Sequence, residues 1–357
     1  MSEEEGALLV LGRAMLPARK AGELLRRYGS AAALLGAEGE LPLSASQRAT
    51  LRAARGQAAR DEAMLARCGA HLVSLLDERY PPLLCEIHDP PPVLYVRGEL
   101  AAGERRAVAI VGSRRTTPYG RAVAQALGRG LAEAGVAVVS GLALGIDAAA
   151  HEGALEAGGR AIAVLGCGID QYYPVAHRDL TDRVAKAGAV ITEFPPETAP
   201  LPMNFPIRNR VIAGMTLGTV VVEAPAKSGA LITAGLALEQ GREVFAVPGS
   251  INSELARGTH QLLKEGAKLV ESVQDILEEL DLEQGTTRAP LPTAGQDGGE
   301  QPAGDPLLAY LSLDPVGLED LQEKTGLPAG ELSARLLLLE LRGLVGRLPG
   351  NRLIRLG

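Results

Sequence analysis

Residues that can hold phosphate follow directly after an apolar run, AVAIV at 107–111. The run leads into Gly112, Ser113, Arg114 and Arg115, and then into Thr-Thr-Pro, which is typical of the start of a helix. A phosphate site needs a glycine that permits close approach of the backbone, hydroxyl groups, guanidiniums and a helix N-terminus. The segment therefore predicts an anion-binding loop that ends at a helix.

Three later segments carry side chains of the same kinds. They are Ser140 and Gly141 at the end of the run 136–140, Phe205, Arg208, Asn209 and Arg210 after the run 189–192, and Lys227, Ser228 and Gly229 after the run 219–223. Arginines close to an aromatic ring suit a polyanion whose bases can stack, and Ser228 can cap a helix whose first N–H groups are free. If the runs are strands of one parallel sheet, the cations of these segments meet at one edge and form a local positive groove.

The sequence holds no familiar enzyme signature. It lacks G-x-G-x-x-G, a P-loop, G-x-S-x-G and H-E-x-x-H. Asp147, Asp170 and Glu193 could in principle form a metal or general-base site, but their spacing matches no ligand pattern. His151 lies one helical turn after Asp147 and is interpreted as its structural partner. We therefore predict no catalytic residue, no metal site and no cofactor.

Composition limits the class of protein. The chain has 357 residues, a formal net charge of −7 and 46% hydrophobic residues, so it is a folded protein of two or three domains whose polyanion site must be local. Cys68, Cys85 and Cys167 are far apart and odd in number, which argues against a disulfide framework and favours the cytoplasm. The acidic N-terminus is unlike a signal peptide, and no apolar run is long enough to span a membrane.

The alternation of apolar runs and helical stretches predicts an α/β fold. Continuous β-branched runs are typical of a doubly wound parallel sheet, whose strands are buried on both faces. The expected strands lie at 107–111, 136–140, 161–165, 189–192, 219–223 and 243–247, with a seventh at 268–270. This sheet domain is expected to span residues 71–281.

Smaller units flank the sheet domain. Residues 1–70 predict short helices, including a single Ala-rich helix over 44–69 with Ser44 or Ser46 as its cap. Residues 282–304 are rich in Gly, Pro, Gln and Thr and predict a flexible linker. Residues 305–357 predict helices, a Gly-Leu-Pro turn and a β-hairpin, which is the order of a winged helix-turn-helix.

Long motifs follow one another in a recognisable order: VGSRRTTPYG, SGLALGIDAAAH, LGCGIDQYYP, FPIRNRVIAG, VVVEAPAKSGALITAGLALEQGREVFAVPG and LLKEGAKLV. In these motifs the chain resembles the DNA-processing protein A family (DprA, also called Smf). The resemblance implies an extended Rossmann-like domain, preceded by a helical domain similar to a sterile-alpha-motif fold and followed by a winged helix. It also implies a homodimer that binds and protects incoming single-stranded DNA and helps load the RecA recombinase during natural transformation, without a cofactor or chemistry on the DNA.

The strand-end residues and the resemblance together predict a DNA groove. It comprises Gly112, Ser113, Arg114, Arg115, Ser140, Gly141, Phe205, Arg208, Asn209, Arg210, Lys227, Ser228 and Gly229. Phe205 or Tyr173 is expected to stack on a base. Leu144 stands where the family usually has Arg, so no phosphate contact is assigned there and affinity is expected to rest more heavily on Arg114 and Arg115.

Two other functions stay open on the sequence alone. Nucleotide-binding relatives of this fold include phosphoribohydrolases, which carry Pro-Gly-Gly-x-Gly-Thr where this chain has Ala-Lys-Ser-Gly-Ala at 226–230. A transcription regulator would read duplex DNA with the winged helix, yet residues 305–357 hold seven acidic against six basic residues. For that module we expect a protein contact or weak binding of duplex DNA.

Overall fold

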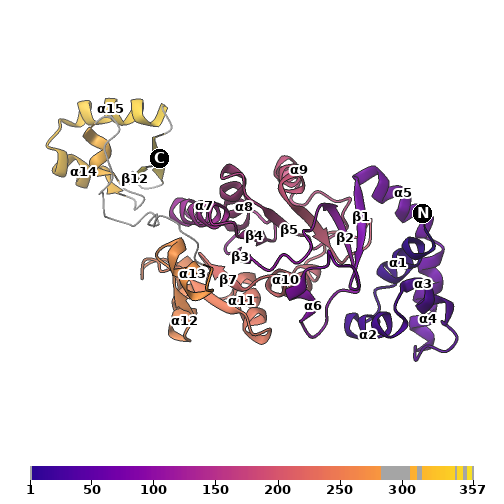
Figure 1. Cartoon of the computed structure of the whole chain (residues 1–357). Coiled ribbons are helices and arrows are strands. Elements are labelled where there is room, and N and C mark those ends of the chain that lie inside the picture. The colour runs from indigo at the N-terminus through magenta and orange to yellow at the C-terminus, as the bar shows by residue number, and fades with distance from the viewer. Residues whose placement is uncertain (1, 283–305, 312–315, 342–343, 349–351, 356–357) are drawn as a thin grey trace.

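A nine-stranded sheet organises the molecule (Figure 1). The computed structural model describes residues 2–282, 306–311, 316–341, 344–348 and 352–355. The strands of the sheet are β1 (Ala70–Ser74), β2 (Val93–Gly98), β3 (Ala107–Val111), β4 (Ala137–Ser140), β5 (Ala161–Val164), β6 (Ala189–Thr192), β7 (Gly218–Val221), β8 (Glu243–Ala246) and β9 (Lys268–Leu269). Their order across the sheet is β1-β2-β6-β5-β4-β3-β7-β8-β9.

The doubly wound parallel sheet predicted from the sequence is confirmed. All neighbours from β6 to β9 are parallel, and all five residues of β3 are buried because helices cover both faces. Strands β1 and β2 were not predicted from the sequence; they pair antiparallel with each other and extend the sheet beyond β6. These two strands are not separated by a crossover helix of ordinary length, so they lack the alternation from which the other strands were predicted.

Helices cover the two faces of the sheet in separate layers (Figure 1). One face is covered by α7 (Pro118–Glu133), α8 (Ile146–Glu156), α9 (Arg178–Ala187) and α13 (Val273–Glu279). The other face is covered by α6 (Pro82–Cys85), α10 (Asn204–Gly214), α11 (Gly229–Glu239) and α12 (Arg257–Lys264). Short 3₁₀ turns at η1 (Val175–His177) and η2 (Glu254–Ala256) complete the connections. No described helix combines the length and the apolar character needed to cross a membrane.

The N-terminal helices pack against the β1–β2 end of the sheet (Figure 1). They are α1 (Glu3–Ala14), α2 (Ala18–Tyr28), α3 (Ala31–Gly36), α4 (Ala45–Arg55) and α5 (Ala58–Cys68). The prediction of a single helix over 44–69 is wrong, because the chain breaks at Gly56, a residue that disfavours a helix interior. Leu8 and Leu25 share one core with Val93 and Val96 of β2, so these helices are joined to the sheet by apolar packing.

The predicted winged helix is present in the described part of the C-terminal region. It consists of η3 (Pro306–Tyr310), β10 (Val316–Gly317), α14 (Leu318–Thr325), α15 (Ala329–Leu341), β11 (Val345–Leu348) and β12 (Arg352–Arg355). Its strands form a sheet in the order β10-β12-β11 around a leucine-rich core of its own. Of the predicted linker, 282–304, only Leu282 is among the described residues, and it is buried against the sheet domain.

Candidate nucleic-acid interface

The candidate site lies where the strand order reverses. β3 pairs with β4 on one side and with β7 on the other, so the loops after β3, β4 and β7 leave the sheet at the same carboxyl edge. In doubly wound sheets this crevice is where ligands bind. An open pocket of about 610 Å³ lies here, and we call it the groove. Ten of the thirteen predicted residues line it, namely Gly112, Ser113, Arg114, Arg115, Phe205, Arg208, Asn209, Lys227, Ser228 and Gly229.

The groove is positively charged although the chain is acidic. Four cations line it, Arg114, Arg115, Arg208 and Lys227, against one carboxylate, that of Asp147. The first two and Lys227 are exposed, and none of the three has an ion-pair partner within the described residues. Exposed cations with no carboxylate to neutralise them attract a polyanion and release its counterions on binding.

An aromatic platform forms part of the groove wall. The rings of Tyr173 and Phe205 lie 5.4 Å apart between centroids, tilted by 38°. The guanidinium of Arg114 lies 5.2 Å from the centre of the Phe205 ring and that of Arg208 lies 5.8 Å from it. Gly166 leaves room for the ring, since a Cβ there would lie 2.8 Å from Cδ1 of Phe205. Such an arrangement offers a π face for a base beside cations for its phosphate.

Arg208 supplies charge from the floor of the groove. Only 4% of its surface is exposed, and its guanidinium donates to the carbonyl oxygens of Val164 and of Gly141, the latter at 3.1 Å. Burial lowers the pKa of this guanidinium to about 10, an effect that the nearby Asp147 carboxylate opposes. Burial likewise raises the pKa of Asp147, against the influence of Arg208. A buried cation of this kind gains from an anion that enters the groove.

The N-terminus of α7 is already occupied by a carboxylate from the chain itself. Glu223, which follows β7, accepts hydrogen bonds from the hydroxyl of Thr116 at 2.7 Å and from the backbone N–H and hydroxyl of Thr117 at 2.9 and 2.5 Å. Gly120 makes this possible, because a Cβ there would lie 2.4 Å from Cδ of Glu223. The prediction that this helix start holds phosphate is therefore wrong.

The start of α11 remains the predicted helix start for an anion. Its N-cap is Ser228, whose hydroxyl accepts from the N–H of Ala230 at 3.2 Å, and Lys227 stands beside it in the groove wall. Sequence reasoning missed Glu223. The sequence shows a carboxylate directly after a strand, but its contact with the start of α7 can be predicted only if β7 is known to lie next to β3.

Three predicted residues lie outside the groove lining. The hydroxyl of Ser140 donates to the carbonyl oxygen of Ile110 at 2.6 Å, and the backbone of Gly141 is bonded to Arg208 and Asp147. Arg210 is paired with Glu193 and, at 3.3 Å, with Asp89. The prediction that these three residues line the groove is therefore wrong. Their contacts instead support the loops around the groove.

Ser113 and Leu144 contribute to the groove without adding charge to it. The hydroxyl of Ser113 both donates to the carbonyl oxygen of Arg115 at 3.0 Å and accepts its N–H at 3.1 Å, so it shapes the loop. Leu144 is 47% exposed and follows Ala143, which lines the groove. Here the chain presents an apolar side chain beside the groove and adds no charge.

The carboxylates considered for a metal or general-base site do not converge. Asp147 accepts from the N–H groups of Gly141 and Ala143 at 3.1 and 3.3 Å, and Asp170 accepts from the N–H of Glu197 at 2.8 Å. Glu193 is bound to an arginine, as described above. Within the described residues there is no group of three His, Cys, Asp or Glu side chains suited to a metal ion.

His151 is not the partner of Asp147, contrary to the sequence interpretation. Its ring is fully buried in α8, and neither nitrogen has a hydrogen-bond partner within the part of the chain that is described. Burial, with a smaller effect from His177, lowers the pKa of His151 to about 3. The folded protein therefore holds this imidazole neutral.

This burial predicts a loss of stability in mild acid. The pKa of His151 is about 6.5 in the unfolded chain and about 3 in the folded chain, so between these two pH values only the unfolded chain takes up the proton. The contribution of neutral His151 to the free energy of unfolding is complete above pH 6.5. It declines by about 1.4 kcal/mol per pH unit as the pH falls below that value. We expect the His151→Met variant to lose free energy of unfolding less steeply than the wild type in urea titrations between pH 7 and 4.5. Parallel curves for the two proteins would contradict the prediction.

Known proteins match the chain over most of its length. A family model described as DNA recombination-mediator protein A matches residues 71–281, and a model described as DprA winged helix domain matches residues 287–351. Protein Smf of Escherichia coli strain K12 is 41% identical over 289 residues, which are 79% of this chain and 76% of that protein.

Solved structures agree with the sequence matches. DNA processing protein A (DprA) of Streptococcus pneumoniae superposes with a TM-score of 0.66 at 38% identity, over 78% of this chain and 98% of that one. DNA processing protein A of Helicobacter pylori, whose structure concerns its single-stranded DNA binding mode, gives a TM-score of 0.53 at 30% identity, over 59% of this chain and 95% of that one. With the motifs, fold and groove described above, these matches show that the chain belongs to the DNA recombination-mediator protein A family, known as DprA or Smf.

Proposed function

We propose that this protein binds single-stranded DNA along the groove at the carboxyl edge of its sheet. The observation that carries the proposal is a groove lined by four cations and an aromatic pair on a chain whose net charge is −7. The Helicobacter pylori relative, studied for its single-stranded DNA binding mode, supports the same ligand. Membership of the family supports a role for this binding in DNA processing.

The geometry suggests how a strand is held. Arg114, Arg115 and Lys227 reach phosphates from the two sides of the groove, and Arg208 adds charge from its floor. A base stacks on the platform that Phe205 forms with its tyrosine neighbour. Such contacts read the backbone and the faces of bases, so we expect little sequence preference.

The enzyme alternative receives no support from the site. A phosphoribohydrolase carries Pro-Gly-Gly-x-Gly-Thr where a helix follows this strand, and here residues 226–230, at the start of α11, read Ala-Lys-Ser-Gly-Ala. The carboxylates of Asp147, Asp170 and Glu193 do not converge on the groove either. We therefore propose a binding protein with no catalytic residue and no cofactor.

The finer roles are proposals of the same kind. We propose that the protein acts in the cytoplasm as a homodimer, protects incoming single strands and helps load RecA recombinase on them during natural transformation. Sedimentation equilibrium tests the dimer, and the rate of RecA assembly on a labelled strand, with and without the protein, tests the loading. A monomer at all concentrations, or an unchanged assembly rate, would remove the corresponding role.

For the winged helix we propose a protein contact, with at most weak binding of duplex DNA. Leu337 and Leu338 of α15 are exposed, at 55% and 57%. The arginine on the same helix, Arg335, is paired with Glu331 at 2.6 Å. A helix that reads the major groove needs free polar and basic side chains, whereas exposed leucines suit a protein surface.

The deciding experiment is a fluorescence-anisotropy titration of a dye-labelled single-stranded oligonucleotide, with the matched duplex alongside. We expect tighter binding of the single strand, with log affinity falling against log salt by about 0.7 for each phosphate contacted. Preference for the duplex that alanine at Arg114 and Lys227 leaves untouched would transfer the activity to the winged helix. A salt slope near zero would contradict binding of phosphates in the groove. Release of free base from adenosine monophosphate would support the phosphoribohydrolase alternative.

A further inference from the structure

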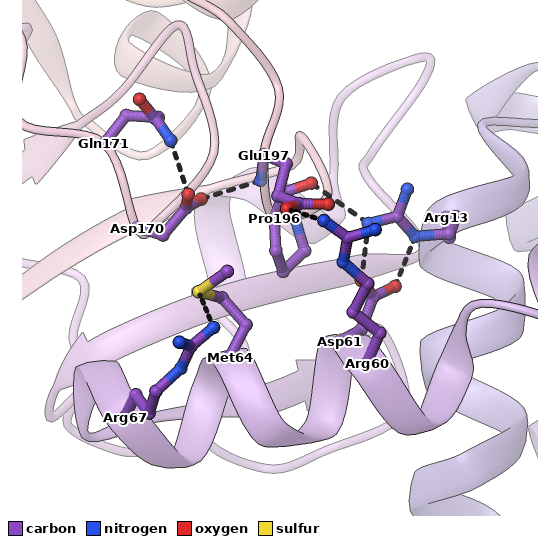
Figure 2. A network of polar contacts seen from close by, with 9 residues as sticks. All are labelled: Arg13, Arg60, Asp61, Met64, Arg67, Asp170, Gln171, Pro196 and Glu197. Carbon is purple, nitrogen blue, oxygen red and sulfur yellow. Dashed lines mark hydrogen bonds and ion pairs between the residues drawn. The ribbon is translucent and has the colours of Figure 1, made fainter.

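A network of polar contacts joins the N-terminal helices to two loops of the sheet domain (Figure 2). Arg13 of α1 binds both carboxylate oxygens of Asp61 of α5 and donates a third hydrogen bond to the carbonyl oxygen of Pro196 at 3.0 Å. The Asp61 side chain is 1% exposed, so its charge is shielded from solvent and depends on Arg13 for compensation. This pair ties two helices to the loop that follows β6.

A second arginine extends the network. Arg60 of α5 donates to Glu197 at 2.5 Å, and the backbone N–H of Glu197 donates to Asp170 at 2.8 Å. Asp170 lies in the loop after β5, so the loops after β5 and β6 are bound to each other and to the helices (Figure 2). We call Arg13, Arg60, Asp61, Asp170, Pro196 and Glu197 the interdomain clasp.

The two clasped loops carry one wall of the groove. Tyr173 follows Asp170 by three residues in the first loop, and Pro200 and Pro202 follow Glu197 closely in the second. The second loop then enters α10, where Phe205 completes the aromatic platform. No member of the clasp lines the groove.

Resting on the proposed function, we propose that the clasp makes the N-terminal helices a positioning element of the DNA site. Arg13 and Arg60 fix the loops that present the aromatic wall, and they touch no DNA themselves. Holding a binding surface in its bound shape lowers the entropy that a ligand must otherwise remove on binding. The helices thus contribute to affinity at a distance, through the placement of Tyr173 and Phe205.

The test uses full-length protein in which the clasp is loosened without exposing a buried charge. Arg13→Lys keeps a cation beside Asp61 but cannot bind both of its oxygens and the Pro196 carbonyl together. Arg60→Ala removes the exposed pair with Glu197. Arg67→Ala is the matched control, because Arg67 is also exposed on α5 and, within the described residues, its hydrogen bond goes to Met64 of its own helix (Figure 2).

The readout is a tryptophan placed at the groove wall. The chain contains no tryptophan, so Tyr173→Trp gives a single reporter. With Arg13→Lys/Arg60→Ala in this background we expect faster acrylamide quenching in the absence of DNA, and single-strand affinity weaker by about three- to tenfold. The slope of log affinity against log salt should stay unchanged, as should the melting temperature within a few degrees. The Arg67→Ala control should match the parent in all four.

Each contrary result has a definite meaning. Equal quenching and equal affinity in the clasp variant and its parent would overturn the inference. A salt slope shallower by about 0.7 would show a direct phosphate contact by Arg60, the one charge that the variant loses, and would also overturn a positioning role. If the wild-type protein bound no single-stranded DNA at all, the proposed function would fail, while the quenching measured without DNA would still decide whether the clasp orders the loops.

Discussion

Replacing Arg114 and Lys227 together by alanine is expected to abolish most of the affinity for single-stranded DNA. The two side chains lie on the loops after β3 and β7, where the strand order reverses, and both are exposed in the groove wall. If each neutralises one phosphate, the salt slope falls by about 1.4, which at 0.1 M salt corresponds to about 25-fold weaker binding from counterion release alone. The measurement is an anisotropy titration at four or more salt concentrations.

A control with the same loss of charge makes this prediction specific. Arg52 of α4 and Lys186 of α9 are exposed and do not line the groove. Alanine at both positions lowers the net charge by the same amount but removes no contact with the strand. We expect this variant to keep nearly the wild-type slope. If the two double variants lose affinity equally, attraction is set by overall charge and the groove is not the site.

Replacing Phe205 by leucine is expected to weaken single-strand binding through a different physical effect. Leucine keeps apolar bulk against Gly166 but offers no π face to a base. Stacking on an aromatic side chain is worth about 1 to 3 kcal/mol per base, which is about 5- to 150-fold in affinity. The salt slope should be unchanged, because no phosphate contact is lost.

Phe205→Tyr is the matched variant for this test. It retains a ring next to Tyr173, so we expect it to restore most of the affinity that leucine loses. Thermal melting of the three proteins separates stacking from damage to the fold. A leucine variant that binds as tightly as the wild type would show that the strand passes the groove without stacking on this ring.

The sequence determined the sheet and the place of the site. Apolar β-branched runs predicted each parallel strand of the central sheet to within a few residues, because burial on both faces leaves no other pattern for such strands. Residues directly after parallel strands must meet at one edge, which is why Arg114, Phe205, Arg208 and Lys227 could be placed in one groove. The order of the motifs was enough to recognise the family.

The tertiary structure decided which of the polar residues are free to act. Arg210 lies two residues from Arg208, yet it is neutralised by Glu193 and Asp89, and the start of α7 is filled by Glu223. These pairings join segments that are 17 to more than 100 residues apart, so they depend on strand order and loop path. Local spacing carries no information about either.

The same reason explains the remaining differences. The Ala-rich composition favours one long helix, which Gly56 interrupts. Strands β1 and β2 join the sheet by antiparallel pairing, which does not require the crossover helix that makes parallel strands predictable. The clasp between Arg13, Asp61 and the loop after β6 forms only when the N-terminal helices pack on the end of the sheet. The sequence specified which side chains could bind a polyanion, and packing between distant segments decided which of them line the groove.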